Sequence, residues 1–497
     1  MKVTLHAFAD YIDSFCWRHS VKLFYLVVLF CCVHVIWGSY VQGVYISPDP
    51  ASYLREAENL YYGYGFNYNG LSGGWGWFSL FPILYPTLIC CVMKITTCNA
   101  YLSSKILACI CLILLAVIIK KNTPKPFLFS LIFLNFGFIW CSLATLSETP
   151  FILFVVAAVF SLNRFQLENN HVYKRAASIL LFCVCAFLTR YFGLFLAFLL
   201  AIYSLSNLVN WMQKREKIHL VKTIVLFFVN AIFITLCVLY FCLNKYMSGY
   251  SSGGERFVFT ENYHDLTLDL LRALLDEVYG MFGNIVHGVI FFTGSSTIID
   301  LITVFCIVTI VVCIIWHRRR IKPIQGMSKN FFVAGLFYYL IFIAYRYTST
   351  MDHFYYRFFI PGTFLFLIAG ISQLSLCKKK YIHLIMMILC VFLVASYVVP
   401  GLTYYKGDGY EETVRKWDET YGSIRPHSIV LFSYSNMSFH PGIMWYRSDI
   451  LFINEISMSS IPSLRNSYPN STIYIDKKYL EKTGWSQNTG SLILLPQ

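Results

Sequence analysis

Apolar stretches recur along most of this chain, and each is close to the ~20 residues that a helix needs to cross the hydrocarbon core of a bilayer. Short polar segments separate these stretches. The pattern predicts an all-α, polytopic membrane domain with about eleven transmembrane helices. The expected spans are residues 23–41, 103–119, 127–146, 150–162, two helices within 176–208, then 223–243, 297–316, 331–345, 358–375 and 381–399.

One further apolar segment, residues 80–95, is short and contains Pro82 and Pro86. We interpret it as an interfacial or re-entrant helix on the outer side of the membrane. If it were a full span, every later loop would change sides. Most of the basic clusters would then lie outside, against the tendency of Lys and Arg to remain in the cytoplasm.

The net charge of +14 comes from short basic clusters between the apolar runs, because residues 401–497 hold 9 Lys+Arg and 9 Asp+Glu. Such clusters predict a cytoplasmic N-terminus and an outside C-terminus. A nucleic-acid-binding protein would carry a basic stripe on a soluble domain, so we expect no nucleic-acid partner. The clusters are Arg18 and Lys22; Lys120, Lys121 and Lys125; Arg164, Lys174 and Arg175; Lys214, Arg215, Lys217 and Lys222; Arg318, Arg319, Arg320 and Lys322; and Lys378, Lys379 and Lys380.

Two domains are expected. Residues 1–400 form the membrane domain, with outer loops at 44–102 and 244–296, and residues 401–497 form a small C-terminal α/β domain outside the membrane. Short β-rich runs in the tail predict its strands. They are residues 428–433, 449–454, 472–476 and 491–495.

Cysteine usage fits a membrane protein without a disulfide framework. The chain has 17 cysteines, mostly inside apolar runs, and the tail from Gly401 onward has none. A disulfide scaffold would concentrate cysteines in the exposed part of the chain. We therefore expect buried thiols that behave as small apolar residues.

Polar residues at the outer ends of the predicted spans are candidates for chemistry. Charged groups at the margin of a bilayer are costly unless they are paired or hydrated, so their collection on one side predicts a polar cavity. Guanidinium groups suit a phosphate, and a carboxylate suits a general base that activates a hydroxyl. The candidates are Asp49, Glu148, Arg190, Asp352, His353 and Arg357.

The first outer loop contains a run that resembles a known family. Residues 49–60 read Asp-Pro-Ala-Ser-Tyr-Leu-Arg-Glu-Ala-Glu-Asn-Leu, and Phe-Pro and Tyr-Pro pairs follow at 81–82 and 85–86. This run resembles the first periplasmic loop of GT-C glycosyltransferases, especially the protein O-mannosyltransferase and aminoarabinose-transferase branch. It is also similar to bacterial and phage transferases that modify O-antigen. Ser-Glu-Thr-Pro at 147–150, Leu-Thr-Arg-Tyr at 188–191 and Tyr-Arg-Phe-Phe-Ile-Pro at 356–361 keep the order of the family's later landmarks, so the resemblance covers about the first 375 residues.

The resemblance implies a polyprenyl-phosphate sugar as donor, an acceptor glycan or glycolipid, and inversion at the anomeric carbon. It places the enzyme in the bacterial inner membrane, with a periplasmic C-terminus and membrane lipids around it. Asp49 would act as the general base with Glu148 as a second catalytic carboxylate, and Arg190 and Arg357 would hold the donor phosphate. The expected substrate contacts are Tyr53, Tyr85, Asp352 and His353.

Two departures from the family leave the use of a divalent metal open. Pro50 occupies the place where the family often has a second acid, and Glu148 stands where Asp is usual. A metal site needs several ligands of suitable chemistry, and this set is incomplete.

Alternative interpretations remain for both the residues and the function. Asp49 could be a solvated turn residue, Glu148 a helix cap, and the arginines interfacial side chains that reach toward water. A transporter or flippase of lipid-linked glycans is a different class, but such proteins usually show paired halves and mid-membrane charges. An O-antigen polymerase or ligase is the other alternative, and it would leave the acidic motif of the first loop unexplained.

Overall fold

The computed structural model describes residues 2–41, 46–253, 262–281, 326–349, 356–376, 382–403, 409–432, 442–454, 461–476 and 492–494. Within them, eight helices are long and apolar enough to cross a membrane, and a bent helix pair makes a ninth span if it is counted as one. The chain is therefore a multi-pass membrane protein. The eight are α2 (Ser20–Val41), α5 (Ala100–Asn122), α8 (Glu148–Leu167), α9 (Val172–Thr189), α10 (Phe195–Lys214) with the preceding turn η2 (Tyr191–Leu194), α11 (Lys217–Ser248), α15 (Gly326–Arg346) and α16 (Tyr356–Ser375).

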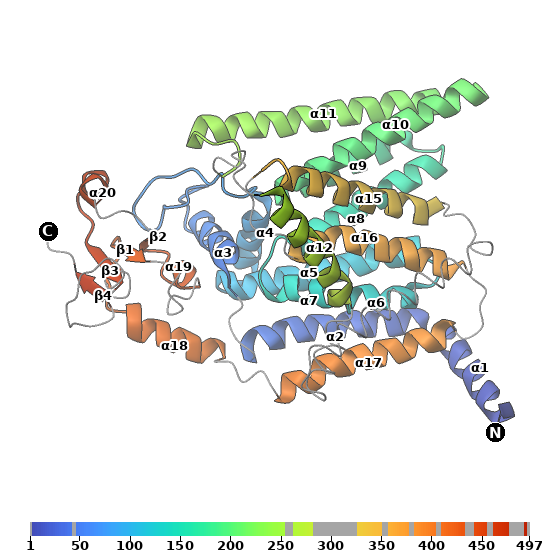
Figure 1. Ribbon diagram of the computed structural model, residues 1–497, viewed down its shortest axis with the longest axis horizontal. Helices are drawn as coiled ribbons and strands as arrows, with labels where there is room; N and C mark the ends of the chain where they lie inside the picture. Colours follow the sequence, from blue (N-terminus) through green and yellow to red (C-terminus); the bar gives the residue numbers. More distant parts are fainter. Residues whose placement is uncertain are drawn as a thin grey trace.

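These helices run roughly side by side in one bundle (Figure 1). Helix α17 (Ile382–Thr403) lies beside α2, where the ring of Tyr397 is 5.1 Å from that of His34, and the N-terminal helix α1 (Lys2–Arg18) packs at the end of α17. Each predicted span within the described residues coincides with a helix except for residues 127–146. The predicted span at 297–316 lies outside the described residues.

The exception is broken into three short helices. They are η1 (Pro126–Phe129), α6 (Ser130–Phe133) and α7 (Phe136–Leu143), with a bend of 60° before α7. The side chain of Asn135 accepts a hydrogen bond from the backbone N–H of Phe138 at 3.1 Å, so it caps the start of α7. The prediction of one continuous helix was wrong because Asn135 begins a new helix inside the apolar run.

The first outer loop is more ordered than its composition predicts. It begins with α3 (Pro48–Tyr61), where prolines in the first turn favour the start of a helix and Ala51, Leu54 and Ala57 form a buried face. The predicted interfacial segment forms α4 (Leu84–Thr96), whose 13 residues span only about 20 Å against a hydrocarbon core of about 30 Å. Its length agrees with a segment that does not cross the membrane on its own.

Basic side chains join helix ends at one end of the bundle. Arg164 donates to the side chain of Asn122 at 2.9 Å, and Arg175 donates to the carbonyl of Arg164 at 2.7 Å. Lys222 donates to the carbonyl of Gln166 at 2.9 Å. These cations lie at the C-terminal ends of α5 and α8, where the partial negative charge of a helix end favours them.

The C-terminal part forms a small four-stranded sheet, as predicted. Its order is β2-β1-β3-β4, with β1 parallel to β2 and β3, and β4 antiparallel to β3. Figure 1 shows this sheet at the end of the bundle opposite α1. The elements are α18 (Tyr410–Tyr421), β1 (Ile429–Phe432), α19 (Ile443–Tyr446), β2 (Leu451–Asn454), α20 (Ile461–Ser467), β3 (Ile473–Asp476) and β4 (Leu492–Leu494), while α12 (Tyr263–Met281) is the amphipathic helix that precedes α15 in the described chain.

The sheet region docks on α3 through buried polar contacts. Both carboxylate oxygens of Glu58 accept hydrogen bonds, from the indole of Trp445 at 2.8 Å and from Ser448 at 2.7 Å. Arg55 donates to Ser72 at 2.8 Å and to the carbonyl of Ile450 at 3.3 Å. The helix that carries Asp49 in its first turn is thus held from the side by the C-terminal region.

Candidate active site

Asp49 lies in the first turn of α3, where the partial positive charge of a helix N-terminus favours a carboxylate. Its Oδ2 is 2.9 Å from Nη1 of Arg357, at the start of α16, and its side chain is 33% exposed. The structure therefore joins two predicted site residues that are about 300 positions apart in the sequence. The carboxylate is paired and also open to solvent.

Glu148 and Arg190 form a second pair, with 2.5 Å between Oε1 and Nη1. Glu148 begins α8 and is 1% exposed, whereas Arg190 occupies an extended residue between α9 and η2. Burial lowers the pKa of Arg190, but the carboxylate of Glu148 outweighs this effect and the pKa rises above its usual range. Arg190 is therefore fixed as a cation.

The guanidinium groups of Arg190 and Arg357 both lie beside the ring of Phe358. The guanidinium carbon of Arg357 lies 4.7 Å from the centre of its ring, and that of Arg190 lies 5.9 Å from it. Cations at these distances are attracted to the face of an aromatic ring. Two fixed positive charges beside one ring are suited to an anion with several oxygens, such as a phosphate.

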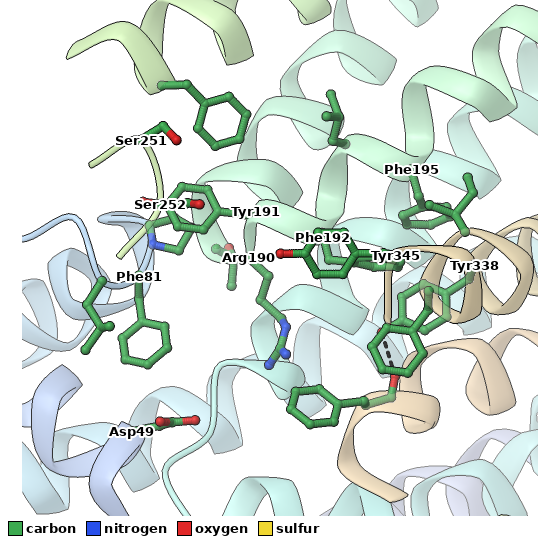
Figure 2. Close-up of a pocket in the computed structure, with 18 of the residues that line it drawn as sticks. Asp49, Phe81, Arg190, Tyr191, Phe192, Phe195, Ser251, Ser252, Tyr338 and Tyr345 are labelled. Atoms are coloured by element: carbon green, nitrogen blue, oxygen red, sulfur yellow. Dashed lines mark hydrogen bonds between the residues drawn. The ribbon is translucent and has the colours of Figure 1, made fainter. Parts of the chain in front are cut away.

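These residues line a cavity of about 650 Å³, within the usual range for small-ligand sites. Figure 2 shows Asp49 and Arg190 on one side of it, with Ser251 and Ser252 nearby and a row of aromatic rings on the other side. A cavity with a charged end and an apolar wall matches an amphipathic ligand. The aromatic wall includes Phe192, Phe195, Phe198, Phe241, Tyr338, Phe342 and Tyr345.

The two predicted tyrosines have different positions. Tyr53 lines the cavity, and its hydroxyl is 3.0 Å from that of Ser147, which also accepts a hydrogen bond from Arg190 at 3.3 Å. Burial raises the pKa of Tyr53 well above its usual value, so its hydroxyl remains protonated. Tyr85 does not line this cavity and packs edge-on against Tyr53 with ring centres 5.0 Å apart.

Asp352 and His353 lie outside the described residues. Among the residues that the structure describes, no group of three or more His, Cys, Asp or Glu side chains could hold a metal ion. The described residues of the cavity thus offer Asp49 as their one carboxylate, and it is already paired with Arg357.

Several residues at the site were not predicted from the sequence. Ser147 and Phe358 each adjoin a predicted residue, so their proximity to Glu148 and Arg357 was the available signal. Lys105 is fully buried, and its Nζ donates to the carbonyl of Leu143 and to the hydroxyl of Thr145, at 2.5 Å in the latter case. Lys105 supports the turn that leads into Ser147 and Glu148. The apolar residues around it in the sequence do not predict this role.

No family model matches the chain, and no curated protein matches it either. Among solved structures, it is similar over nearly its whole length to ArnT from Cupriavidus metallidurans, an aminoarabinose transferase, in the apo state. The TM-score is 0.54 at 11% identity, covering 92% of this chain and 94% of that chain. The chain has the GT-C fold.

The same protein bound to undecaprenyl phosphate gives a TM-score of 0.55 at 10% identity, covering 94% of this chain and 97% of that chain. A more distant likeness is to the oligosaccharyltransferase AglB from Archaeoglobus fulgidus in complex with an inhibitory peptide and a dolichol-phosphate. Its TM-score is 0.44 at 12% identity, covering 96% of this chain and 74% of that chain. The GT-C fold that the first-loop motif predicts is confirmed by the ArnT comparison.

Proposed function

We propose that this protein is an inverting glycosyltransferase that moves a sugar from a polyprenyl-phosphate donor to an acceptor glycan or glycolipid. The observation that carries the proposal is the cavity, which combines one accessible carboxylate, two fixed guanidinium groups and an aromatic wall. Support also comes from the fold, because one of the similar ArnT structures holds undecaprenyl phosphate.

The donor would bind with its phosphate between Arg190 and Arg357. A guanidinium group donates two parallel hydrogen bonds to phosphate oxygens, and the shared position beside Phe358 presents both groups to one anion. The first isoprene units would lie along the aromatic wall, which removes apolar surface from water.

Asp49 is the general base of the proposed reaction. The acceptor hydroxyl oxygen attacks the anomeric carbon from the face opposite the phosphate, and its proton passes to Asp49. The bond from the anomeric carbon to the phosphate oxygen breaks, and the polyprenyl phosphate leaves with the electron pair. Arg190 and Arg357 stabilise the negative charge that develops on it.

The two acid–arginine pairs, Glu148 with Arg190 and Asp49 with Arg357, have different roles in this mechanism. Glu148 is buried and does not line the cavity, so it orients Arg190 and fixes its charge. Asp49 lines the cavity, and its partner Arg357 can turn toward the phosphate when donor binds. Asp49 then loses a neighbouring positive charge, which makes its carboxylate a stronger base at the moment when a base is needed.

The proposed reaction takes place at the outer face of a bacterial inner membrane. The N-terminus would be cytoplasmic, and residues 401–497 would form a periplasmic domain beside the membrane domain of residues 1–400. O-antigen or lipopolysaccharide is the proposed acceptor class. Part of the loop 244–296 would cover the donor, since Ser251 and Ser252 already line the cavity.

The test is mass spectrometry of surface glycans from a bacterial host that expresses either the wild type or Asp49→Asn. We expect the wild type to add the mass of one sugar to each acceptor unit and the variant to add none. A polymerase or ligase would change glycan length instead, and a flippase would change the amount of glycan at the surface. Either of those results, or no change at all, would reject the transferase.

A further inference from the structure

A second cavity of about 470 Å³ lies beside the first, between the first outer loop and the end of α11. Its size also falls within the range of small-ligand sites. We call it the aromatic groove. Its main side chains are Tyr68, Trp75, Trp77, Ser79, Ser248 and Tyr250.

The loop that carries the tryptophans is held in one shape by Asn67. The buried Asn67 side chain donates to the carbonyl of Gly74 at 3.2 Å and accepts from the N–H of Gly76 at 2.9 Å. Asn67 and Trp77 also form an isolated antiparallel bridge. Because the loop backbone is already held and Asn244 accepts a hydrogen bond from the indole of Trp77, a ligand that stacks here does not have to order the loop, and less binding energy is lost.

The groove lies beyond the membrane core. The 32 residues of α11 are about 48 Å long, well over the roughly 30 Å of hydrocarbon that a span must cross, so the helix extends past the bilayer core. Lys245 lies in its last turn, and a charged side chain there places the end at Met247 and Ser248 outside that core. The loop also touches the C-terminal region, since Gly73 faces His427 and Gly74 faces Tyr468. In Figure 1 this loop (blue) reaches from α3 toward α20. An aromatic belt at the lipid interface does not account for this position.

The lining favours a neutral sugar. Trp75 is 68% exposed, so its ring faces are open, and none of the described residues that line the groove carries a charge. The C–H face of a pyranose packs on an aromatic ring, while the hydroxyls of Ser79 and Ser248 can bond to sugar hydroxyls. Among these described residues, a phosphate or carboxylate would meet no cation.

The groove connects with the proposed catalytic cavity. Leu80 lines both, and the hydroxyl of Tyr68 is 3.4 Å from that of Ser52, which follows Asp49 by one helical turn. On the other side, Asn244 accepts from the indole of Trp77 at 3.0 Å and donates to the hydroxyl of Tyr191 at 2.8 Å. A sugar in the groove would therefore lie beside the helical turn that carries Asp49.

We propose that the aromatic groove is the acceptor subsite and that it binds a neutral sugar of the acceptor glycan, with Trp75 as its main stacking ring. The direction of transfer rests on the proposed function. The binding of the sugar does not, and it can be measured without turnover.

The test is saturation-transfer NMR on the full chain in nanodiscs, with maltose, cellobiose, lactose and chitobiose as neutral probes and glucuronic acid as the anionic probe. We expect at least one neutral probe to bind the wild type, and to bind Trp75→Ala roughly tenfold more weakly because one stacked ring is lost. Trp75→Tyr keeps a ring and should retain most of the binding. Tyr62→Ala is the matched control, since Tyr62 is 62% exposed in the same loop and does not line the groove.

The inference is overturned if no neutral probe binds, if Trp75→Ala binds as the wild type does, or if glucuronic acid binds equally well through Trp75. Failure of the proposed function would give a different combination of results from failure of the acceptor subsite. In that case the neutral probe still needs Trp75, but the glycan masses of cells with wild type and Asp49→Asn are the same.

Discussion

Two acid–arginine pairs form the centre of the site, and they differ in exposure. Asp49 is one-third exposed and lines the cavity, whereas Glu148 is buried and does not. A general base must reach both its substrate and the solvent that removes the proton, so Asp49 fits this role. A buried carboxylate with an arginine is better suited to fixing that arginine in place.

Asp49→Asn should lower turnover by about a hundredfold to ten-thousandfold, because the amide keeps the size of the side chain but does not accept a proton. Asp49→Glu should retain only a trace of activity, since the longer side chain misplaces the base. The measurement is turnover of the purified variants with a polyprenyl-phosphate sugar and a matching acceptor, with thermal unfolding as the control for folding. Activity of Asp49→Asn within about threefold of the wild type would remove Asp49 from this role.

Arg190 and Arg357 offer a second test. Their Ala variants should weaken use of the donor strongly, and their Lys variants should recover only part of it, because Lys keeps the charge but not the two-pronged geometry. The Michaelis constant for the donor and the turnover are measured for all four proteins. If both Ala variants show wild-type kinetics, neither arginine holds the phosphate.

The sequence predicts which residues gather at the site but not how each is placed. Asp49, Arg190 and Arg357 were expected on one face because charged groups at helix ends avoid the bilayer core, and the structure brings them together. That Glu148 is buried depends on how α8 packs against the turn supported by Lys105. Such packing joins segments that are distant in the sequence, so the types of residue along the chain do not predict it.

At the scale of elements, length and hydropathy predict the spans, and short β-rich runs predict the strands of the C-terminal sheet. These signals do not predict helix α3 or the break before α7. Helix α3 is hidden because several of its buried positions are polar, namely Ser52, Arg55, Glu56 and Asn59, and an aromatic, glycine-rich stretch follows it. The break before α7 is hidden because an apolar run looks the same whether its helix continues or restarts, and only Asn135 marks the place.

Helix α3 also carries a buried acid that makes its stability depend on pH. Burial raises the pKa of Glu56 to about 9, although Asn59 and Arg55 lower it in part. The folded protein therefore holds this proton more tightly than the unfolded chain does. The stability that Glu56 contributes is complete below its unfolded pKa, and it is lost progressively as pH rises toward the folded pKa.

Glu56→Gln keeps the shape and the acceptor but does not titrate. We expect its melting temperature to match that of the wild type near about pH 5 and to exceed it increasingly toward about pH 9. Thermal unfolding in detergent across this range is the measurement, and Glu412→Gln on the exposed face of α18 is the control. A constant difference between Glu56→Gln and the wild type at every pH would show that Glu56 is not the group responsible.

At the scale of the whole molecule, the two ends of the bundle have different chemistry. Basic side chains bind helix carbonyls at one end, and the acid–arginine cavity, the aromatic groove and the C-terminal sheet lie toward the other. Glu58 connects the sheet region to α3, the helix that carries Asp49. Its hydrogen-bond partners Trp445 and Ser448 lie almost 400 residues away in the sequence. Composition separates the tail from the bundle, but it does not predict that the tail docks on α3.

This polarity leads to a prediction about orientation. Lys and Arg between spans remain in the cytoplasm, so the basic end should be inside and the end with the cavity should be outside. Reporter fusions after Lys121 and Arg215 should show cytoplasmic activity, and a fusion at Gln497 should show periplasmic activity. The structure adds a constraint, because the helix ends at Asn122 and Arg164 are hydrogen-bonded and must lie on one side together.

A donor on a polyprenyl chain, with its sugar at the outer face, can reach Asp49 only if this orientation holds. A cytoplasmic Gln497 together with a periplasmic Lys121 would invert the bundle as a whole. The cavity would remain intact, but it would face the cytoplasm, and the outer-face reaction would be ruled out together with its periplasmic acceptor. If Lys121 and Gln497 report the same side, the bundle itself is contradicted, because the structure places the basic helix ends and the C-terminal sheet at opposite ends of the bundle.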